Sequence, residues 1–405
     1  MMKHEDLTVQ CADCGRDFVI TSNEQLFYGS KGFALPKRCK DCRKKRKEVR
    51  QTQEKALQDK ARGEKIEEEE KELRSLLQEN PIQQADFKHL ENQKPETTLF
   101  AVGNGFDIMH GVPSSYWDFQ KTLGKNSELR FHLENYLKVD ADKLWYNFED
   151  SLSHINAGVM LDVMDMWLDI YDVYRHDAAS MADLHCAIDT AMLPMQVITE
   201  QLPRRFRGWV ETLIGNGSKP CEHFLSKQSL YLNFNYTDFL ETLYGIPKTQ
   251  INYIHGCRKK VKYQPKEQLI LGHVPNVDYL KEYKPNPTMV PLYKNRRKRE
   301  ILDYAIETGI NQWVSYYEEV FTKHTPEIIQ ENATFFSGTE CVTDIFVIGH
   351  SLSEVDYPYF TEIVRHNANK AFWHIGYHSL SDFKNLLAFV SEMGIKDNCF
   401  EVFRT

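Results

Sequence analysis

Hydrophobic residues along this chain form short continuous runs, separated by longer stretches in which apolar and polar residues mix. Such runs are typical of parallel strands buried on both faces. They occupy residues 98–102, 229–235, 251–256, 268–273, 344–352 and 370–376. The stretches between them are mostly helical in pattern, over 114–225, over 295–330 and from about Ser381. Strands that alternate with helices predict an open, parallel α/β sheet.

The first 96 residues follow a different pattern. Residues 43–79 contain almost no apolar side chain before Leu73 and consist mainly of strong helix formers, until Asn80-Pro81 ends the run. This pattern predicts a charged helix, either solvated as a connector or paired with a second copy of the chain. Residues 80–96 are predicted to be a polar linker. We therefore divide the chain into 1–47, 48–96 and 97–405, with helical insertions at 114–225 and 280–340.

Composition narrows the class of protein. The 405 residues are 41% hydrophobic and 27% charged, as in ordinary globular proteins, and no apolar run is long enough to span a membrane. The nine cysteines are an odd number, which fits a reducing compartment, so a cytoplasmic protein is expected. The net charge is −8, although nine basic residues lie between Lys37 and Arg50. Nucleic acid is therefore a candidate partner for the N-terminal part only.

Four cysteines are paired by spacing: Cys11 with Cys14, and Cys39 with Cys42. Four thiolates suit a tetrahedral zinc ion, and a module this small needs a metal because its core is too small. We predict a structural Zn²⁺ site with short strands and turns between the pairs, including one at Gln25–Tyr28. The segment also resembles a family of zinc-ribbon modules in bacterial proteins.

A glycine turn follows the run at 98–102. Gly103-Asn104-Gly105 ends the strand, and Gly111 follows six residues later, a spacing that differs from the dinucleotide fingerprint. Glycine allows a sharp turn and the close approach of a ligand, and the N-terminus of a following helix favours phosphate.

Polar residues also end three other runs, at Asn235, at His255-Gly256 and at Gly349-His350-Ser351. In open α/β sheets, ligands bind outside the carboxyl ends of the strands. Together with the first glycine turn, these residues predict a nucleotide pocket at one edge of the sheet.

The same motifs carry a resemblance, which extends over residues 98–360. Gly103-Asn104-Gly105-Phe106-Asp107-Ile108-x-x-Gly111, Asn233-Phe234-Asn235-Tyr236-Thr237-Asp238-x-Leu240-Glu241, Tyr253-Ile254-His255-Gly256 and Ile348-Gly349-His350-Ser351-Leu352-x-x-x-Asp356 look like the bacteriophage abortive-infection AbiH family. More distantly, they look like the sirtuin-like NAD hydrolases of bacterial anti-phage defence, which carry corresponding motifs in the same order.

The resemblance implies a Rossmann-like domain that binds NAD as a substrate and hydrolyses it to nicotinamide and ADP-ribose. Asn235 and His255 match the catalytic asparagine and histidine. The positions around the dinucleotide are Gly103, Asn104, Gly105, Phe106, Asp107, Gly349, His350 and Ser351.

The chain departs from the hydrolase pattern at Asn104 and Asp107, which replace Ala and Ser, and at Thr237, which makes Asn233 a rival of Asn235. The chemistry suits these residues. An amide can orient water and ribose hydroxyls without adding charge, and a histidine can accept a proton near neutral pH.

Other functions were weighed. A sirtuin-type deacetylase carries its zinc module after the catalytic histidine, whereas both cysteine pairs here precede the first strand. A serine hydrolase would use Ser351, but Ser353 stands where its motif has glycine. A sensor or adaptor would use the zinc ribbon and the basic helix to bind nucleic acid or a protein. For the hydrolase, a homo-oligomer in an inactive resting state is expected, released by a phage-derived trigger.

Overall fold

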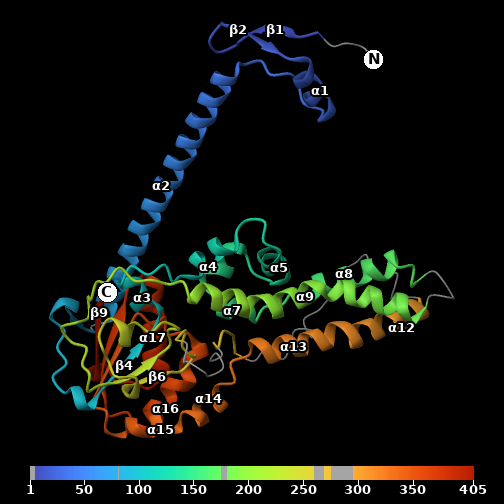
Figure 1. The fold of residues 1–405 in the computed structure, drawn as a ribbon. Coiled ribbons are helices and arrows are strands. Elements are labelled where there is room, and N and C mark those ends of the chain that lie inside the picture. Colours follow the sequence, from blue (N-terminus) through green and yellow to red (C-terminus); the bar gives the residue numbers. More distant parts are fainter. Residues whose placement is uncertain (1–4, 81, 175–179, 260–268, 275–294) are drawn as a thin grey trace. The chain divides into compact units, whose positions relative to one another are not determined.

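The computed structural model describes residues 5–80, 82–174, 180–259, 269–274 and 295–405. The chain divides into two compact units, Met1–Asn80 and Pro81–Thr405. Figure 1 shows the elements of both. Among the described residues, none of the helices has the length and apolar content that crossing a bilayer requires.

The N-terminal unit is an antiparallel hairpin followed by two helices. Its elements are β1 (Leu7–Gln10), β2 (Asp17–Ile20), α1 (Ser22–Ser30) and α2 (Lys40–Glu79). The expected charged helix is α2. The turn or strand expected at Gln25–Tyr28 is wrong, because these residues lie inside α1. The cause is a capping box, in which Thr21 and Glu24 bond each other's backbone amides and start a helix.

The second unit is built on a seven-stranded parallel sheet with the order β3-β9-β8-β7-β4-β5-β6. Its strands are β3 (Gln83–Ala85), β4 (Thr98–Val102), β5 (Leu230–Asn233), β6 (Ile251–Tyr253), β7 (Asp344–Ile348), β8 (Phe372–Tyr377) and β9 (Phe400–Arg404). Counted from β4, the order is 3-2-1-4-5-6 with β3 added at the edge. This is the doubly wound order, and it places the topological switch point between β4 and β7. The expected fold class is confirmed.

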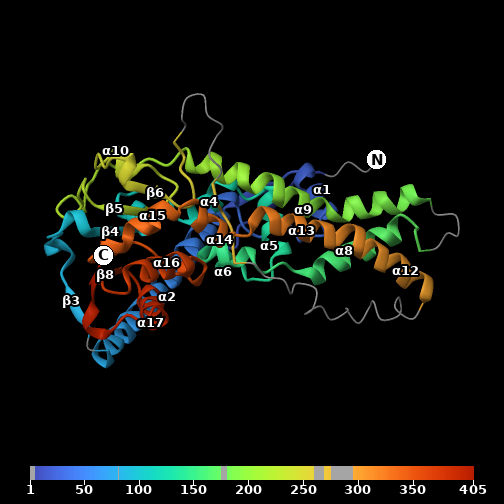
Figure 2. The ribbon, with the colours of Figure 1, turned by 90° about the horizontal axis from the view of Figure 1, so that it is seen from below.

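Helices flank the sheet and fill the predicted insertions. They are α3 (Asn104–Met109), α4 (Tyr116–Leu123), α5 (Glu128–Tyr136), α6 (Ala141–Tyr146), α7 (Phe148–Leu152), α8 (Ala157–Ile170), α9 (Met181–Val210), α10 (Phe239–Thr242), α12 (Arg296–Ala305), α13 (Asn311–Phe321), α14 (Thr325–Glu331), α15 (Ala333–Ser337), α16 (Tyr357–Asn367) and α17 (Leu380–Glu392). Figures 1 and 2 show that α8, α9, α12 and α13 run side by side away from the sheet. Residues 280–294 of the second predicted insertion lie outside the described residues.

Three sequence-based expectations for this unit differ from the structure. Part of the expected linker, Gln83–Ala85, is strand β3, which pairs with β9. The strand β9 itself had no counterpart in the sequence analysis. The run at 268–273 is not a strand of the sheet: from residue 269 onward it is extended, and His273 forms an isolated bridge with Thr322. Its apolar side chains are covered by helices, since Leu271 is buried in the core that the insertions form with the sheet.

Candidate functional site

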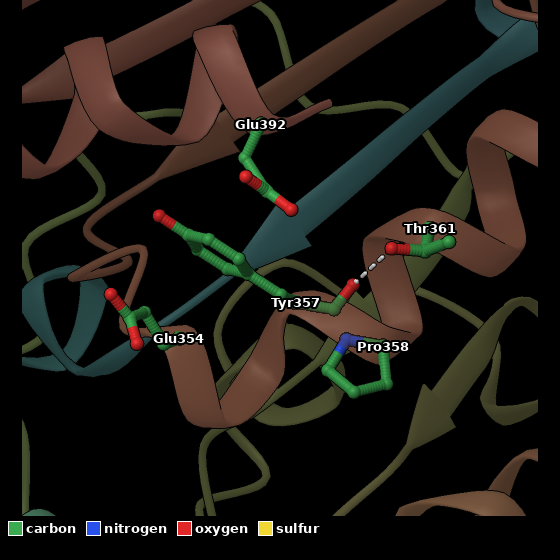
Figure 3. A pocket seen from close by; sticks show the side chains of 5 residues that line it. All are labelled: Glu354, Tyr357, Pro358, Thr361 and Glu392. Carbon is green, nitrogen blue, oxygen red and sulfur yellow. Dashed lines mark hydrogen bonds between the residues drawn. The ribbon is translucent and has the colours of Figure 1, made fainter. Parts of the chain in front are cut away.

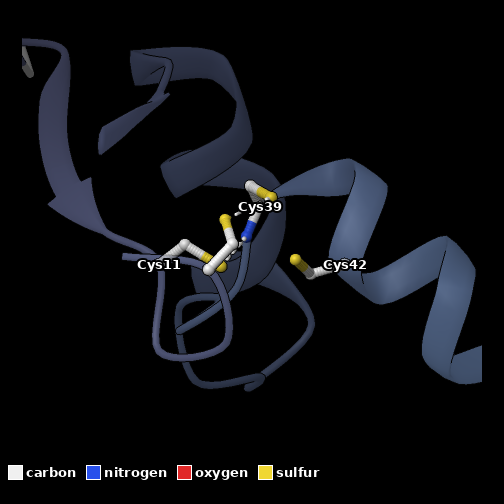
Figure 4. A group of neighbouring side chains, drawn as sticks. Cys11, Cys39 and Cys42 are labelled. Carbon is white, nitrogen blue, oxygen red and sulfur yellow. Dashed lines mark hydrogen bonds between the residues drawn. The ribbon is translucent and has the colours of Figure 1, made fainter. Parts of the chain in front are cut away.

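The four paired cysteines converge in the N-terminal unit. Cys11 and Cys14 lie in the turn between β1 and β2, while Cys39 and Cys42 lie at the start of α2. Their sulfur atoms are all within 4.8 Å of one another, and Figure 4 shows Cys11, Cys39 and Cys42 turned toward a common centre. Four sulfurs bound at about 2.3 Å to one tetrahedral ion would be about 3.8 Å apart. The Sγ atoms of Cys14 and Cys39 are 3.9 Å apart, which fits zinc.

The electrostatics of the cluster also favour a cation. The Cys39 amide donates to Cys11 Sγ (3.3 Å) and is the main cause that lowers the pKa of the Cys11 thiol to about 6. The neighbouring thiols, Cys39 first, raise the pKa of Cys42 to about 12. Four thiolates therefore cannot coexist here without a positive charge, which a bound Zn²⁺ supplies.

In the second unit, the strand-end motifs meet at the carboxyl edge of the sheet. The two glycine turns, after β4 and β7, pack directly against each other at the switch point. The Gly105 amide donates to the Gly349 carbonyl oxygen (2.7 Å). A Cβ atom on Gly103 would lie 2.5 Å from His350 Cα, and one on Gly349 would lie 2.2 Å from the Phe106 nitrogen. Glycine is required because backbone meets backbone, and the Gly105 amide at the start of α3 is bonded within the protein.

Asp107 is buried behind the first turn and holds two strand-end side chains. Its carboxylate accepts hydrogen bonds from Asn235 Nδ2 (3.1 Å) and from Thr237 Oγ1 (2.8 Å). Asn235 Nδ2 also donates to the Gly103 carbonyl oxygen (2.9 Å). Burial raises the pKa of Asp107 to about 7, although Thr237 and Asn235 favour the ionised form. Asn233 helps to position Asn235, because its Oδ1 accepts a hydrogen bond from the backbone N–H of Asn235 (3.0 Å).

A second buried cluster lies at the same edge of the sheet, around Asp356. Its Oδ1 is 3.3 Å from Lys323 Nζ, which also contacts Glu149 Oε2 at 2.7 Å. Burial raises the pKa of Asp356, but the Lys323 charge and the His350 hydrogen bond outweigh it and hold that pKa well below its usual value. Burial lowers the pKa of Lys323, yet Asp356 and Glu149 raise it above the usual value. Lys323 therefore forms ion pairs with two carboxylates, and these join the segment after α13 to helix α7 and to the turn before α16.

Two histidines face this carboxylate with different hydrogen bonding. His350 Nδ1 accepts from the Leu352 amide (2.9 Å), so in the neutral ring Nε2 carries the proton, 3.3 Å from Asp356 Oδ2. His255 Nε2 is 3.6 Å from Asp356 Oδ1 and, in the described part of the chain, has no hydrogen-bond partner. Burial first, then the Lys323 charge, lower the pKa of His255 to about 3, so its ring is neutral. The ring of Phe234 contacts both imidazoles.

The cluster reaches the surface on one side. Glu149 is partly exposed and accepts hydrogen bonds from two partly exposed tyrosines, Tyr116 (2.6 Å) and Tyr236 (3.3 Å). His255, His350 and Asp356 lie deeper, each below a tenth exposed. Glu149 and the two tyrosines are therefore the more exposed members of this cluster.

The predicted residues thus fall into two sets. The buried set comprises Gly103, Phe106, Asp107, Asn235, His255 and His350. Asn104 and Ser351 are exposed at the two turns, and Gly105 and Gly349 are partly exposed between them. Sequence reasoning gave no role to Lys323 and Tyr359, which lie outside every motif, and none to Asp356, although that residue ends the motif that begins at Ile348.

A surface hollow of about 610 Å³ lies beside the turn that carries Asp356, at the start of α16. Glu354, Tyr357, Pro358, Thr361 and Glu392 line it (Figure 3). None of the strand-end residues lines this hollow, so it is separate from the buried centre.

The fold and its centres define a two-part protein: a four-cysteine zinc module, and a doubly wound α/β unit with a buried ionic centre at its switch point. The family model described as "Bacteriophage abortive infection AbiH" matches residues 99–377, and the chain belongs to this family. It is thus a protein of abortive infection, an anti-phage defence. A model described as "Probable treble clef domain" matches residues 5–51, which confirms the expected zinc module. No curated protein and no solved structure matches the chain.

Proposed function

We propose that the α/β unit is an enzyme that binds NAD and hydrolyses its nicotinamide–ribose bond, so that abortive infection proceeds by depletion of NAD. The observation that carries the proposal is the unpartnered Nε2 of His255. It lies in a buried charged centre, at the edge of the sheet where doubly wound proteins bind nucleotides.

The charge balance of the centre supports this reaction. When the C1′–N bond breaks, its electron pair leaves with nicotinamide, and positive charge develops on the ribose. Glu149 and Asp356 are two carboxylates against the single ammonium of Lys323, so the three together carry a surplus negative charge. That surplus stabilises a developing cation in a site with little water.

His255 has the protonation state that the second half of the reaction requires. Its neutral ring can take a proton from the attacking water while the water oxygen bonds to C1′. Asn235, fixed by Gly103 and Asp107, is proposed to orient the ribose. The exposed Asn104 and Ser351 are proposed to contact NAD from the two turns, which the glycines hold together.

Nicotinamide release from NAD by the purified chain tests the proposal. We expect His255→Ala and Asn235→Ala each to lower turnover by about a hundredfold, as for the loss of a positioned acid–base group. His223→Ala is the matched control, because this exposed histidine lies outside the buried centre and its hydrogen bond among the described residues is to the Phe87 carbonyl oxygen (3.0 Å). Turnover that survives both site substitutions would contradict the proposal.

The same assay tests for an inactive resting state, which we expect because the centre is almost wholly buried in this structure. We propose that a phage-derived trigger exposes it and that the active form is a homo-oligomer. Turnover that rises on adding lysate from infected cells, together with a change in sedimentation coefficient, would support this regulation.

The alternative is a sensor or adaptor. It is favoured by the treble-clef match and by four exposed lysines at the start of α2, Lys40, Lys44, Lys45 and Lys47. A chain that shows no NAD turnover, even with infected-cell lysate, but binds DNA or RNA with steep salt dependence would favour this function.

A further inference from the structure

Two polar atoms in the buried centre have no hydrogen-bond partner among the residues that the structure describes. They are Nε2 of His255 and the hydroxyl of Tyr359, and the two residues are 2% and 0% exposed. Buried polar groups in proteins are nearly always paired, since leaving one unpaired costs about 1–3 kcal/mol. Two unpaired groups in one centre therefore point to a partner that the protein itself does not supply.

The two residues lie close together but come from different elements. His255 follows β6, Tyr359 lies in α16, and their ring centroids are 5.7 Å apart in an edge-to-face arrangement. Burial, then the charges of Asp356 and Glu149, raise the pKa of Tyr359, so its hydroxyl lies within the field of both carboxylates.

Two other fully buried tyrosines of the described residues are paired. Tyr317 is also fully buried, and its hydroxyl donates to the Leu152 carbonyl oxygen at 2.8 Å. Tyr231 donates to the Ser226 carbonyl oxygen at 2.7 Å. Tyr359 thus differs from these two tyrosines in that its hydroxyl is left without a partner at the charged centre.

The hydrogen-bonding capacity of the two groups selects the chemistry of the ligand. The imidazole of His255 is neutral, so one of its nitrogens carries a proton and the other a lone pair. We assign the lone pair to Nε2, which has no hydrogen-bond partner among the described residues. Nε2 therefore offers a lone pair, while the Tyr359 hydroxyl offers a proton. A carboxylate or phosphate would be repelled by Asp356 and Glu149, and an ammonium group could not accept from tyrosine. A hydroxyl group donates to one partner and accepts from the other.

We infer that His255 and Tyr359 together bind one hydroxyl group at the buried centre, by donation from Tyr359 and acceptance by His255 Nε2. The inference rests on the proposed function, in which that hydroxyl belongs either to the ribose of NAD or to the attacking water. Tyr359 then touches the reacting groups, and its loss affects the reaction without removing a charge.

Tyr359→Phe tests the inference, with Tyr317→Phe as the matched control for the loss of a buried tyrosine hydroxyl. NAD turnover is measured well below the thermal midpoint of every variant. We expect Tyr359→Phe to lower kcat/KM by about tenfold, the effect of losing one hydrogen bond, and Tyr317→Phe to retain wild-type kinetics with a lowered thermal midpoint. A raised KM at constant kcat would identify the ribose hydroxyl, and a lowered kcat at constant KM the water.

The outcomes separate this inference from the proposed function. Wild-type kinetics in Tyr359→Phe, from a wild-type chain that turns NAD over, would overturn the inference alone. If the wild-type chain shows no turnover, the proposed function fails, and the thermal shift caused by ADP-ribose becomes the readout. A shift in the wild type and in Tyr317→Phe that Tyr359→Phe loses would uphold the hydroxyl site, and a shift unchanged in Tyr359→Phe, or absent from the wild type, would overturn it.

Discussion

Lys323 lies fully buried between the carboxylates of Glu149 and Asp356, at 2.7 and 3.3 Å. Removing one partner of a buried ion pair leaves the opposite charge without compensation, whereas an exposed pair is screened by water. At the scale of single residues, we therefore expect the stability of the buried centre to depend strongly on the charge of Lys323. The chain offers an exposed lysine pair for comparison, Lys259 with Glu241 at 2.6 Å.

We expect Lys323→Met to lower the free energy of unfolding by about 3–5 kcal/mol, because two carboxylates would remain buried without their cation. Lys259→Met should lower it by less than about 1 kcal/mol, since that lysine is nearly half exposed. Urea denaturation at pH 7 measures both. Equal effects of the two substitutions would show that the buried pair has no special role in stability.

The Asp107 carboxyl predicts a pH dependence. Its pKa of about 7 in the folded chain exceeds the ordinary 3.8, so between these values the folded state holds the proton more tightly and stability falls as pH rises. Asp107→Asn keeps an oxygen for Thr237 and Asn235 but cannot ionise. Its free energy of unfolding relative to the wild type should therefore increase between pH 4 and pH 7, by roughly 4 kcal/mol at most.

Urea denaturation at pH 5, 6, 7 and 8 checks this prediction. Asp118→Asn is the control: partial burial raises the pKa of Asp118, but bonds from Lys121 and Ser115 hold it below the usual value. The change in the free energy of unfolding caused by Asp118→Asn should thus be constant above pH 5. If Asp107→Asn changes the free energy of unfolding by the same amount at every pH in this range, the raised pKa of Asp107 is contradicted.

At the scale of elements, the strands β4 and β7 are joined at their carboxyl ends by two glycine turns. The switch point of a doubly wound sheet usually opens a crevice there, but here the turns are bonded to each other through Gly105 and Gly349. The turns therefore set the positions of His350 and Asp107 relative to the strands.

Gly349→Ala tests this close approach, with Gly394→Ala as its control. Both glycines have a φ near +60°, but only Gly349 has atoms within 4 Å of an added Cβ, the nearest at 2.2 Å. We expect Gly394→Ala to cost about 1 kcal/mol from backbone strain, and Gly349→Ala about 3 kcal/mol, because the turns must also separate. Similar midpoints of thermal unfolding for the two variants would argue that the turns are loosely packed.

At the scale of the whole molecule, the chain consists of two units that depend on different physics. The α/β unit has a continuous core of buried apolar side chains. The described part of the N-terminal unit leaves large apolar residues such as Leu26, Phe27 and Phe33 exposed. Its fold must therefore be held largely by the metal, as in other small modules.

Chelation should accordingly affect one unit and spare the other. We expect the full chain to bind a single zinc ion at the four described cysteines, and a chelator to abolish protection from hydrogen exchange in residues 5–40 without changing the unfolding of the α/β unit. Elemental analysis should find the zinc lost from Cys42→Ser and retained in Cys186→Ser, whose cysteine is exposed and outside the cluster. Zinc retained in Cys42→Ser would refute a four-cysteine site.

The sequence by itself determined the features that depend on local spacing. Strand runs at 98–102 and 344–348, the charged helix before Asn80 and the two cysteine pairs follow from periodicity, composition and spacing, and the structure confirms them. The polar residues at strand ends could be placed at one edge because parallel strands share that edge. The run at 268–273 failed as a strand because burial under helices and burial in a sheet give the same apolar pattern.

Only the tertiary structure decided the composition of the buried centre. Glu149, Lys323 and Asp356 come from an inserted helix, the segment after α13 and the turn before α16, and no local pattern connects segments so far apart. The same holds for the glycines, whose sequence signal indicated a close approach without saying whether a ligand or another turn approaches. Charge balance and unpaired hydrogen-bonding groups exist only once the chain has folded, and it is these that give His255 and Tyr359 their proposed roles.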